Sequence, residues 1–179
     1  MGEPVILEAV RTPIGKRNGA LRAYRPDALY AKVLDALLER TGIDPGLIGD
    51  VVTGCVTQVG EQGANVGRLG VLLSRLPKEV PAVSLNRMCG SSQQAVHFAA
   101  QAIAAGDVDF AIAGGVESMS RAPWIVERSQ ERDAPALTPD SVAHQSVVGW
   151  RLINPKMHPD WILSLGQSSQ RIAERLGIG

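Results

Sequence analysis

Short β-rich runs alternate with helical runs from Met1 to about Val116, and this alternation limits the possible folds more than any other feature. Apolar and β-branched runs predict four strands, at 5–10, 50–57, 80–85 and 109–117. Helical periodicity predicts three helices, at 26–42, 65–77 and 90–106. Strands that alternate with helices form mostly parallel sheets with helices on both faces. The sequence therefore predicts an α/β domain over residues 1–118.

The character of the sequence changes after about Ser118. Residues 119–160 carry many prolines and charges without sustained periodicity, which predicts loops and short helices. A last amphipathic helix is predicted over 168–177. We therefore expect a second region over residues 119–179.

The predicted helix at 90–106 is apolar or small on nearly every side. A helix with this pattern is expected to be buried on every side. One sheet covers only one face of a helix, so the pattern predicts that something else covers the other face.

Composition narrows the functional classes. Eighteen basic residues balance eighteen acidic ones, so no overall charge attracts the chain to nucleic acid or to an anionic membrane surface. The N-terminal residues lack a secretory pattern, and no apolar run is long enough to span a bilayer. We expect a cytoplasmic protein with neither nucleic acid nor membrane as a partner.

The chain has two cysteines, Cys55 and Cys89, which are too few for a disulfide framework. No cluster of cysteine and histidine has metal-ligand spacing, so we expect no metal site. Cys55 lies within a strand-like run, which favours a place in the core.

Cys89 follows a strand and a short turn, and it directly precedes Gly90 and Ser91 at the start of a predicted helix. A helix N-terminus favours the thiolate form of a cysteine, and small neighbours leave room for a thioester and for amides that bind an oxyanion. The alternative is a buried cysteine that only fills space. The position alone leaves both interpretations open.

A nucleophilic thiol usually needs a base, and the sequence offers no clear one. His97 lies about 12 Å along the same helix from Cys89 and is expected to pack against neighbours instead. His144 and His158 lie in the predicted loop region. The segment GGVESMS (114–120) matches no nucleotide-binding pattern, and we interpret it as a turn that positions Glu117 to Met119.

Four segments of the chain together match one known family. LNRMCGSSQQAV, around Cys89, is similar to the acyl-enzyme cysteine signature of thiolases, the acetyl-CoA acetyltransferases and 3-ketoacyl-CoA thiolases. VILEAVRTPIGKRNGAL, GCVTQVGEQGANVGR and AIAGGVESMSRAPW resemble thiolase segments in the same order along the chain. The resemblance covers essentially the whole chain and implies a thiolase-like N-terminal half followed by part of a loop domain.

The resemblance implies a function in fatty acid metabolism. Cys89 would attack an acyl-CoA thioester, hold the acyl group, and pass it to CoA or to an acetyl-CoA carbanion. Coenzyme A would be a substrate or product and not a bound cofactor. The resemblance also implies a homo-oligomer, a dimer or tetramer, that associates through this half.

Substrate contacts from Met119, Leu165 and Gly166 are implied as well. Many family members carry His-Met-Gly, or a similar methionine–glycine pair, where Ser164, Leu165 and Gly166 stand. The resemblance therefore does not fix the length of the acyl chain.

In thiolases a second half supplies the activating histidine, an acid/base cysteine and a glycine of the oxyanion hole. We therefore expect this chain to be inactive alone, and helix 90–106 to lie between the sheets of two halves. One alternative is a non-catalytic chain, or a subunit that gains its other half from a partner. Another is a condensing enzyme like ketoacyl synthase or HMG-CoA synthase, although the segments flanking Cys89 resemble thiolases more.

Overall fold

The computed structural model describes residues 3–127, 129, 133, 137–146 and 153–178. The chain divides into two compact units, Met1–Ala122 and Pro123–Gly179. The first unit contains a parallel sheet and the residues that form the candidate site.

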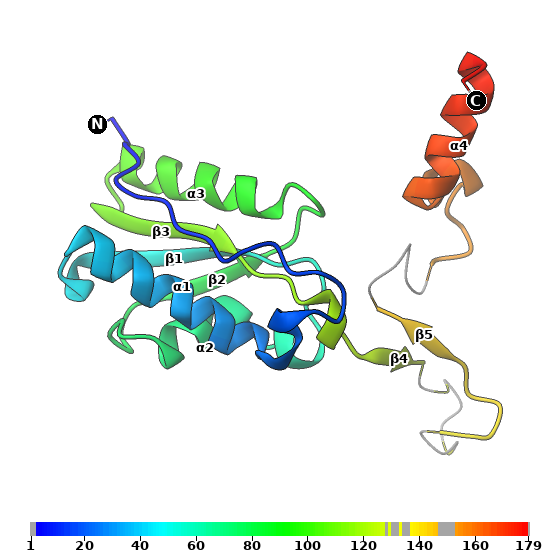
Figure 1. Ribbon diagram of the computed structural model, residues 1–179, viewed down its shortest axis with the longest axis horizontal. Helices are drawn as coiled ribbons and strands as arrows, with labels where there is room; N and C mark the ends of the chain where they lie inside the picture. Colours follow the sequence, from blue (N-terminus) through cyan, green and yellow to red (C-terminus); the bar gives the residue numbers. More distant parts are fainter. Residues whose placement is uncertain (1–2, 128, 130–132, 134–136, 147–152, 179) are drawn as a thin grey trace. The chain divides into compact units, whose positions relative to one another are not determined.

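Three parallel strands form the sheet of the first unit: β1 (Ile48–Gly54), β2 (Ala82–Leu85) and β3 (Phe110–Gly115). Their order is β2-β1-β3, so β1 lies in the centre (Figure 1). Val51 of β1 pairs with Ala82 on one side and Ile112 on the other, and it is fully buried. The predicted parallel α/β architecture is confirmed.

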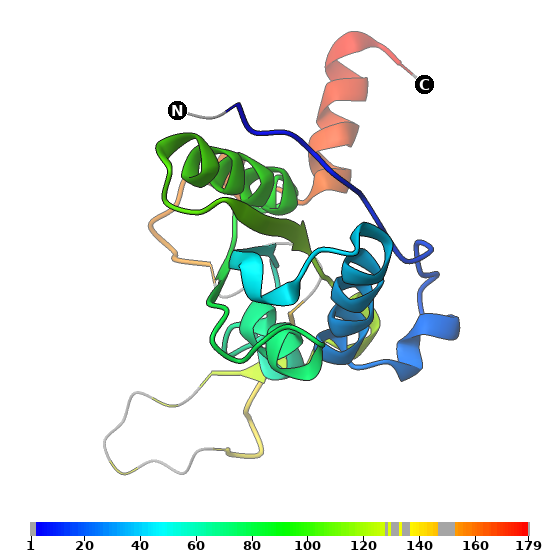
Figure 2. The ribbon, with the colours of Figure 1, turned by 90° about the vertical axis from the view of Figure 1, so that its left-hand side faces the viewer.

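Helices cover both faces of this sheet. The helices α1 (Pro26–Thr41) and α2 (Val66–Leu73) lie on one face, and α3 (Ser91–Ala105) lies on the other (Figures 1 and 2). The core between the sheet and the first two helices consists of Tyr30, Leu34, Leu38, Ile48, Val51, Val71, Leu76, Val80 and Ile112. The helices α1, α2 and α3 match the three predicted helices, with one difference. Helix α2 ends at Leu73, before the predicted end, because Ser74 has an extended backbone conformation.

The strand predicted at 5–10 is wrong. Residues 3–10 belong to no strand, and the side chains of Val5, Ile6 and Leu7 are exposed. The run has strand-forming residues, but a strand also needs a hydrogen-bonded neighbour, and none of the described strands pairs with it.

The third helix is buried on one side only in this chain, which agrees with the expectation that its other face is covered by a second half. Ala95 and Ala99 of α3 are buried against the sheet. Val96 and Phe98 point away from it and are 42% and 45% exposed. The sheet therefore covers one face of α3 and leaves an apolar face open.

The second unit contains a two-stranded antiparallel sheet and a helix. The strands are β4 (Trp124–Val126) and β5 (Ala143–Gln145), and the helix is α4 (Leu165–Leu176). The sequence predicted no strand here, because three-residue strands carry too little periodicity. The helix begins before the predicted 168 because Ser164 and Gln167 form a capping box. Among the helices of the described residues, none is long and apolar enough to cross a membrane.

Candidate active site

A pocket of about 370 Å³ lies at the carboxyl ends of β1 and β3, beside the first turn of α3. Parallel α/β sheets commonly bind ligands outside the carboxyl ends of their strands. The pocket brings both cysteines together with a carboxylate. It is lined by Gly54, Cys55, Val56, Met88, Cys89, Ser91, Ser92, Gly115, Val116 and Glu117.

Cys89 lies on a tight turn between β2 and α3, and its side chain is exposed. The preceding residue, Met88, has a left-handed backbone with φ of 50°. A non-glycine residue in this region costs on the order of 1 kcal/mol or more, and it persists only where its surroundings hold it. Two bonds close the turn: the Gly90 N–H donates to the Arg87 carbonyl at 3.1 Å, and the Ser91 N–H donates to the Met88 carbonyl at 3.0 Å.

The side chain of Ser91 ties the turn to the helix. Its hydroxyl donates to the Met88 carbonyl at 2.6 Å and accepts the Arg87 N–H at 2.9 Å. Arg87 also binds Gln94, one turn further along α3. In the part of the chain that the structure describes, the Cys89 N–H donates to no protein group. A free amide therefore stands beside the exposed sulfur.

Two glycines let α3 lie directly on the strand ends. Gly54 and Gly115 are register partners in β1 and β3. A Cβ atom on Gly54 would lie 2.5 Å from the Ser92 nitrogen, and one on Gly115 would lie 2.0 Å from the Ser92 Oγ. The contact at Gly54 is with helix backbone, so only glycine permits this approach there. At Gly115 the Ser92 hydroxyl can rotate away, but a Cβ atom would also lie 2.7 Å from the Gly54 carbonyl oxygen. Gly54 thereby fixes the height of Cys89 above the sheet.

Glu117 forms the opposite wall of the pocket. Its Oε2 accepts the Val56 N–H at 2.8 Å, and its Oε1 accepts the Thr57 N–H at 3.3 Å. The side-chain amide of Gln62 donates to Oε1 at 3.1 Å. The turn predicted around Glu117 thus binds the loop that follows β1.

A family model described as "Thiolase, N-terminal domain" matches residues 4–176. The chain belongs to the thiolase family. It is 42% identical over 180 residues to a beta-ketoadipyl-CoA thiolase of Acinetobacter baylyi, an alignment that covers 99% of this chain and 44% of the relative. It is 49% identical over 123 residues to a steroid 3-ketoacyl-CoA thiolase of Mycobacterium tuberculosis, covering 69% of this chain and 30% of the relative.

Among solved structures, the thiolase fold is shared with the acetyl-CoA acetyltransferase of Bacillus anthracis. The TM-score is 0.77 at 27% identity, and the match covers 95% of this chain and 41% of the other. The chain therefore spans less than half the length of the relatives that it matches. Its fold is that of a thiolase N-terminal half.

The second thiol of this thiolase pocket, Cys55, differs from Cys89. It is 1% exposed, and its Sγ lies 3.9 Å from Glu117 Oε2. Burial, followed by the nearby Glu117 charge, raises the pKa of Cys55 to about 12. A thiol with this pKa stays protonated at neutral pH and is a poor nucleophile. The expected core position of Cys55 is confirmed, although one side of it lines the pocket.

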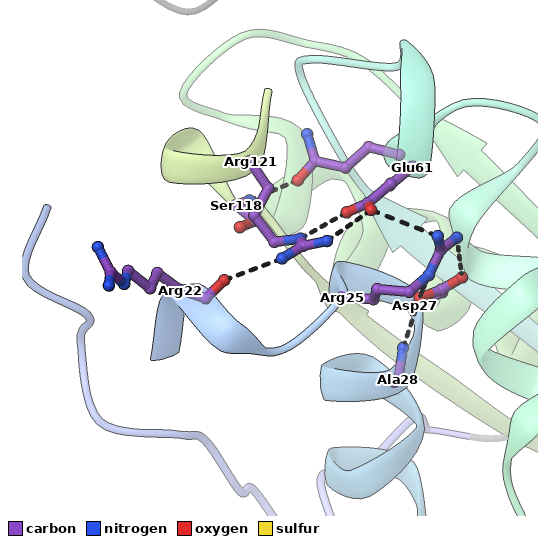
Figure 3. Close-up of polar contacts among 8 residues, drawn as sticks. Arg22, Arg25, Asp27, Ala28, Glu61, Ser118 and Arg121 are labelled. Carbon is purple, nitrogen blue, oxygen red and sulfur yellow. Dashed lines mark hydrogen bonds and ion pairs between the residues drawn. The ribbon is translucent and has the colours of Figure 1, made fainter. Parts of the chain in front are cut away.

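An ion-pair network fixes the segment that follows Glu117 (Figure 3). Arg121 donates from Nε and Nη2 to the two carboxylate oxygens of Glu61, both at 2.6 Å, and from Nη1 to the Arg22 carbonyl at 3.1 Å. Arg25 also contacts Glu61 at 3.3 Å. Hydrogen bonding to Arg121 lowers the pKa of Glu61. Sequence reasoning missed this network because its members are about 35 to 100 residues apart.

The remaining residues named from the sequence are not gathered at the pocket within the first unit. Met119 starts a short 3₁₀-helix, Met119–Arg121, and is 59% exposed. Leu165 and Gly166 are the first residues of α4 in the second unit, and both are exposed. Their contacts with substrate stay a prediction.

The histidines offer no base for Cys89 inside the first unit. His97 is exposed on α3, so the expectation that it packs against neighbours is wrong. His144 lies on β5 and His158 accepts the Asp160 N–H at 3.2 Å, both within the second unit.

Proposed function

We propose that the intact protein is an acyl-CoA acyltransferase of the thiolase type, with Cys89 as the carrier of the acyl group. The observation that carries this proposal is the exposed Cys89 thiol in the pocket, on a left-handed turn at the start of α3. The family of the chain supports the reaction class. The second thiol, Cys55, is buried and protonated and does not compete for this role.

In the first step of thiolysis, the Cys89 sulfur attacks the 3-keto carbon of a 3-ketoacyl-CoA. In the first step of condensation, it attacks the thioester carbonyl carbon of an acyl-CoA. A carbon–sulfur bond to Cys89 forms, and the carbonyl electron pair moves to oxygen to give a tetrahedral oxyanion. The free Cys89 N–H and the positive end of the α3 dipole stabilise this oxyanion. In thiolysis the tetrahedral intermediate breaks the C2–C3 bond and expels the acetyl-CoA carbanion, and in condensation it breaks the bond to the CoA sulfur and expels the CoA thiolate. The leaving group takes up the proton that the Cys89 thiol has lost, and an acyl-cysteine thioester remains.

In the second step, the acyl group leaves Cys89. Attack by the thiol of CoA completes the thiolysis of a ketoacyl-CoA, and attack by an acetyl-CoA carbanion completes a condensation. Both directions use the same covalent thioester, which divides one difficult transfer into two easier ones. CoA enters and leaves as a substrate or product, without a resident cofactor.

The substrate class is a 3-ketoacyl-CoA or acetyl-CoA. The relatives are named as thiolases of beta-ketoadipyl-CoA and of steroid 3-ketoacyl-CoA, and the solved structure as an acetyl-CoA acetyltransferase. These names share a CoA thioester and differ in the acyl part. A homo-oligomer in the cytoplasm, a dimer or tetramer, completes the proposal.

We expect residues 1–179 alone to turn over no substrate, because the described part of the first unit places no histidine at the pocket. A chain that gains its remaining residues from a partner is the alternative. Mixing the purified chain with the separately purified second half of a relative tests it. Restored thiolysis would favour the alternative.

The direct test is covalent labelling. The intact protein is incubated with acetoacetyl-CoA, quenched in acid, digested and examined by peptide mass analysis. We expect an acetyl group on the peptide that contains Cys89, and none after Cys89→Ala. Acetylation of Cys55, or of neither cysteine, would refute the proposal.

A further inference from the structure

We propose that Asn86 and Glu117 are positioning residues for Cys89, joined through the backbone of Val56 into one hydrogen-bonded relay. The relay ties together the three segments that follow β1, β2 and β3 at the pocket. Its consequence for acyl transfer rests on the function proposed above. The relay itself can be measured without that function.

The relay ends at Met88, whose left-handed backbone aims the next residue, Cys89, into the pocket. Methionine has no intrinsic preference for this conformation, so neighbouring groups must hold it. The Asn86 Oδ1 accepts the Met88 N–H at 2.8 Å. On the other side of the residue, the Ser91 hydroxyl donates to the Met88 carbonyl. Side chains therefore hold Met88 at both its amide and its carbonyl.

Asn86 is exposed and needs an anchor of its own to hold Met88 in place. Its Nδ2 donates to the carbonyl of Val56 at 3.1 Å. Val56 belongs to the loop after β1, 30 residues earlier in the chain. The asparagine therefore uses one end of its amide for the turn and the other end for the opposite pocket wall.

Val56 is held in turn by Glu117, whose Oε2 accepts its N–H at 2.8 Å. The side chain of Gln62, which is 3% exposed, holds the Glu117 carboxylate on the side away from the pocket. Its amide nitrogen donates to Glu117 Oε1 and to the Thr57 carbonyl. The Gln62 carbonyl oxygen accepts the Ser118 N–H. Glu117 is thus fixed by a buried side chain, although it faces an open pocket.

These contacts run without interruption from Gln62 through Glu117, Val56 and Asn86 to Met88. The sheet alone would fix the three strand ends but not the loops beyond them. The relay joins those loops and sets the distance between Cys89 and the wall that faces it. Misplacement of a reacting group by about 1 Å costs about 100-fold in rate.

The first experiment measures amide hydrogen exchange of the 179-residue chain by ¹⁵N NMR. We expect Asn86→Ala to speed exchange of the Met88 amide about tenfold, because its acceptor is lost. We expect Glu117→Ala to speed exchange at Val56 about tenfold and at Met88 about threefold. The double variant should exchange at Met88 no faster than Asn86→Ala, since both act on one relay.

Asn154→Ala is the matched control, because Asn154 Oδ1 accepts the Lys156 N–H at 2.9 Å in a turn of the same kind within the second unit. Val51 and Ile112 report on the folded core. If Glu117→Ala loosens these core amides, Glu117→Gln replaces it: glutamine keeps the size of the side chain, but both oxygens of Glu117 accept from N–H donors, so the glutamine NH2 group must face a donor and break a contact of the relay. Unchanged Met88 exchange in a folded Glu117 variant would overturn the relay.

The second experiment measures turnover of the intact protein with acetoacetyl-CoA. We expect Asn86→Ala and Glu117→Gln to lower kcat by about 10- to 100-fold, with KM changed less than about threefold. Alkylation of Cys89 by iodoacetamide should stay within about threefold of wild type, because a small reagent needs no alignment. An active wild type with unaffected variants would refute the positioning role. A wild type that forms no acyl-Cys89 would refute the proposed function and leave the exchange result standing.

Discussion

Replacing Gly54 by alanine tests how closely α3 must approach the sheet. The new Cβ would lie 2.5 Å from the Ser92 nitrogen, 2.6 Å from the Ser91 carbonyl carbon and 2.8 Å from the Ser92 Cα. All three are backbone atoms of the first turn of α3, so no side-chain rotation relieves the contact. To reach an ordinary separation of about 3.5 Å, this turn must move by roughly 1 Å.

Overpacking of this kind costs about 1–3 kcal/mol, and we expect about 3 kcal/mol because only backbone can move. With a slope of about 2 kcal/mol per molar urea, the unfolding midpoint followed by circular dichroism should fall by about 1.5 M. Cys89 moves with the helix, so acyl transfer by the intact protein should fall about 100-fold.

Gly15→Ala is the control, because the nearest atom to its new Cβ is a flexible Leu21 methyl at 3.4 Å. This variant should unfold within about 0.5 kcal/mol of wild type. Equal unfolding midpoints and equal acyl-transfer rates for Gly54→Ala and Gly15→Ala would show that Gly54 does not set the height of Cys89 above the sheet.

Three further outcomes follow from the structure. Because Arg121 lowers the pKa of Glu61, that carboxylate stabilises the fold above about pH 4.5, and this contribution is lost as the pH falls. The Tm measured from about pH 5 to pH 3 should therefore drop less steeply for Glu61→Gln than for the wild type. Burial raises the pKa of Cys55 to about 12, so iodoacetamide at about pH 8 should modify Cys89 alone in the folded chain and both cysteines in concentrated urea, as read by peptide mass; equal labelling of both in the folded chain would contradict this. Ser164→Ala removes the capping box of α4 and should destabilise that helix by about 1 kcal/mol, seen as faster exchange of its first-turn amides, whereas unchanged exchange would show that the cap contributes nothing.

The sequence predicts the elements of the first unit well because their signals are local. The helix that begins after Cys89 and the buried strand around Val51 both follow from runs of neighbouring residues. The strand predicted at 5–10 is wrong because this signal is also local: strand-forming residues do not by themselves supply a neighbouring strand to pair with. The place of Cys89 at a strand–helix junction is thus predictable, and its backbone geometry is not.

The walls of the pocket are beyond sequence reasoning because their contacts are long-range. Met88 takes a left-handed conformation on account of Asn86 and Ser91, not of its own preference. The carboxylate of Glu117 binds amides that lie about 60 residues earlier. Only the parallel register of β1 and β3 brings these groups together.

The central position of β1 also affects how the chain folds during synthesis. β1 leaves the ribosome before both of its neighbours, and the register partners of Val51 follow about 30 and about 60 residues later. One edge of this apolar strand therefore stays unpaired until β2 has been made and the other until β3 has been made, and unpaired edges invite pairing between nascent chains. Of the helices α1 to α4, α1 alone precedes it and can shield one face. The strand that organises the finished sheet is thus the segment most open to aggregation during translation.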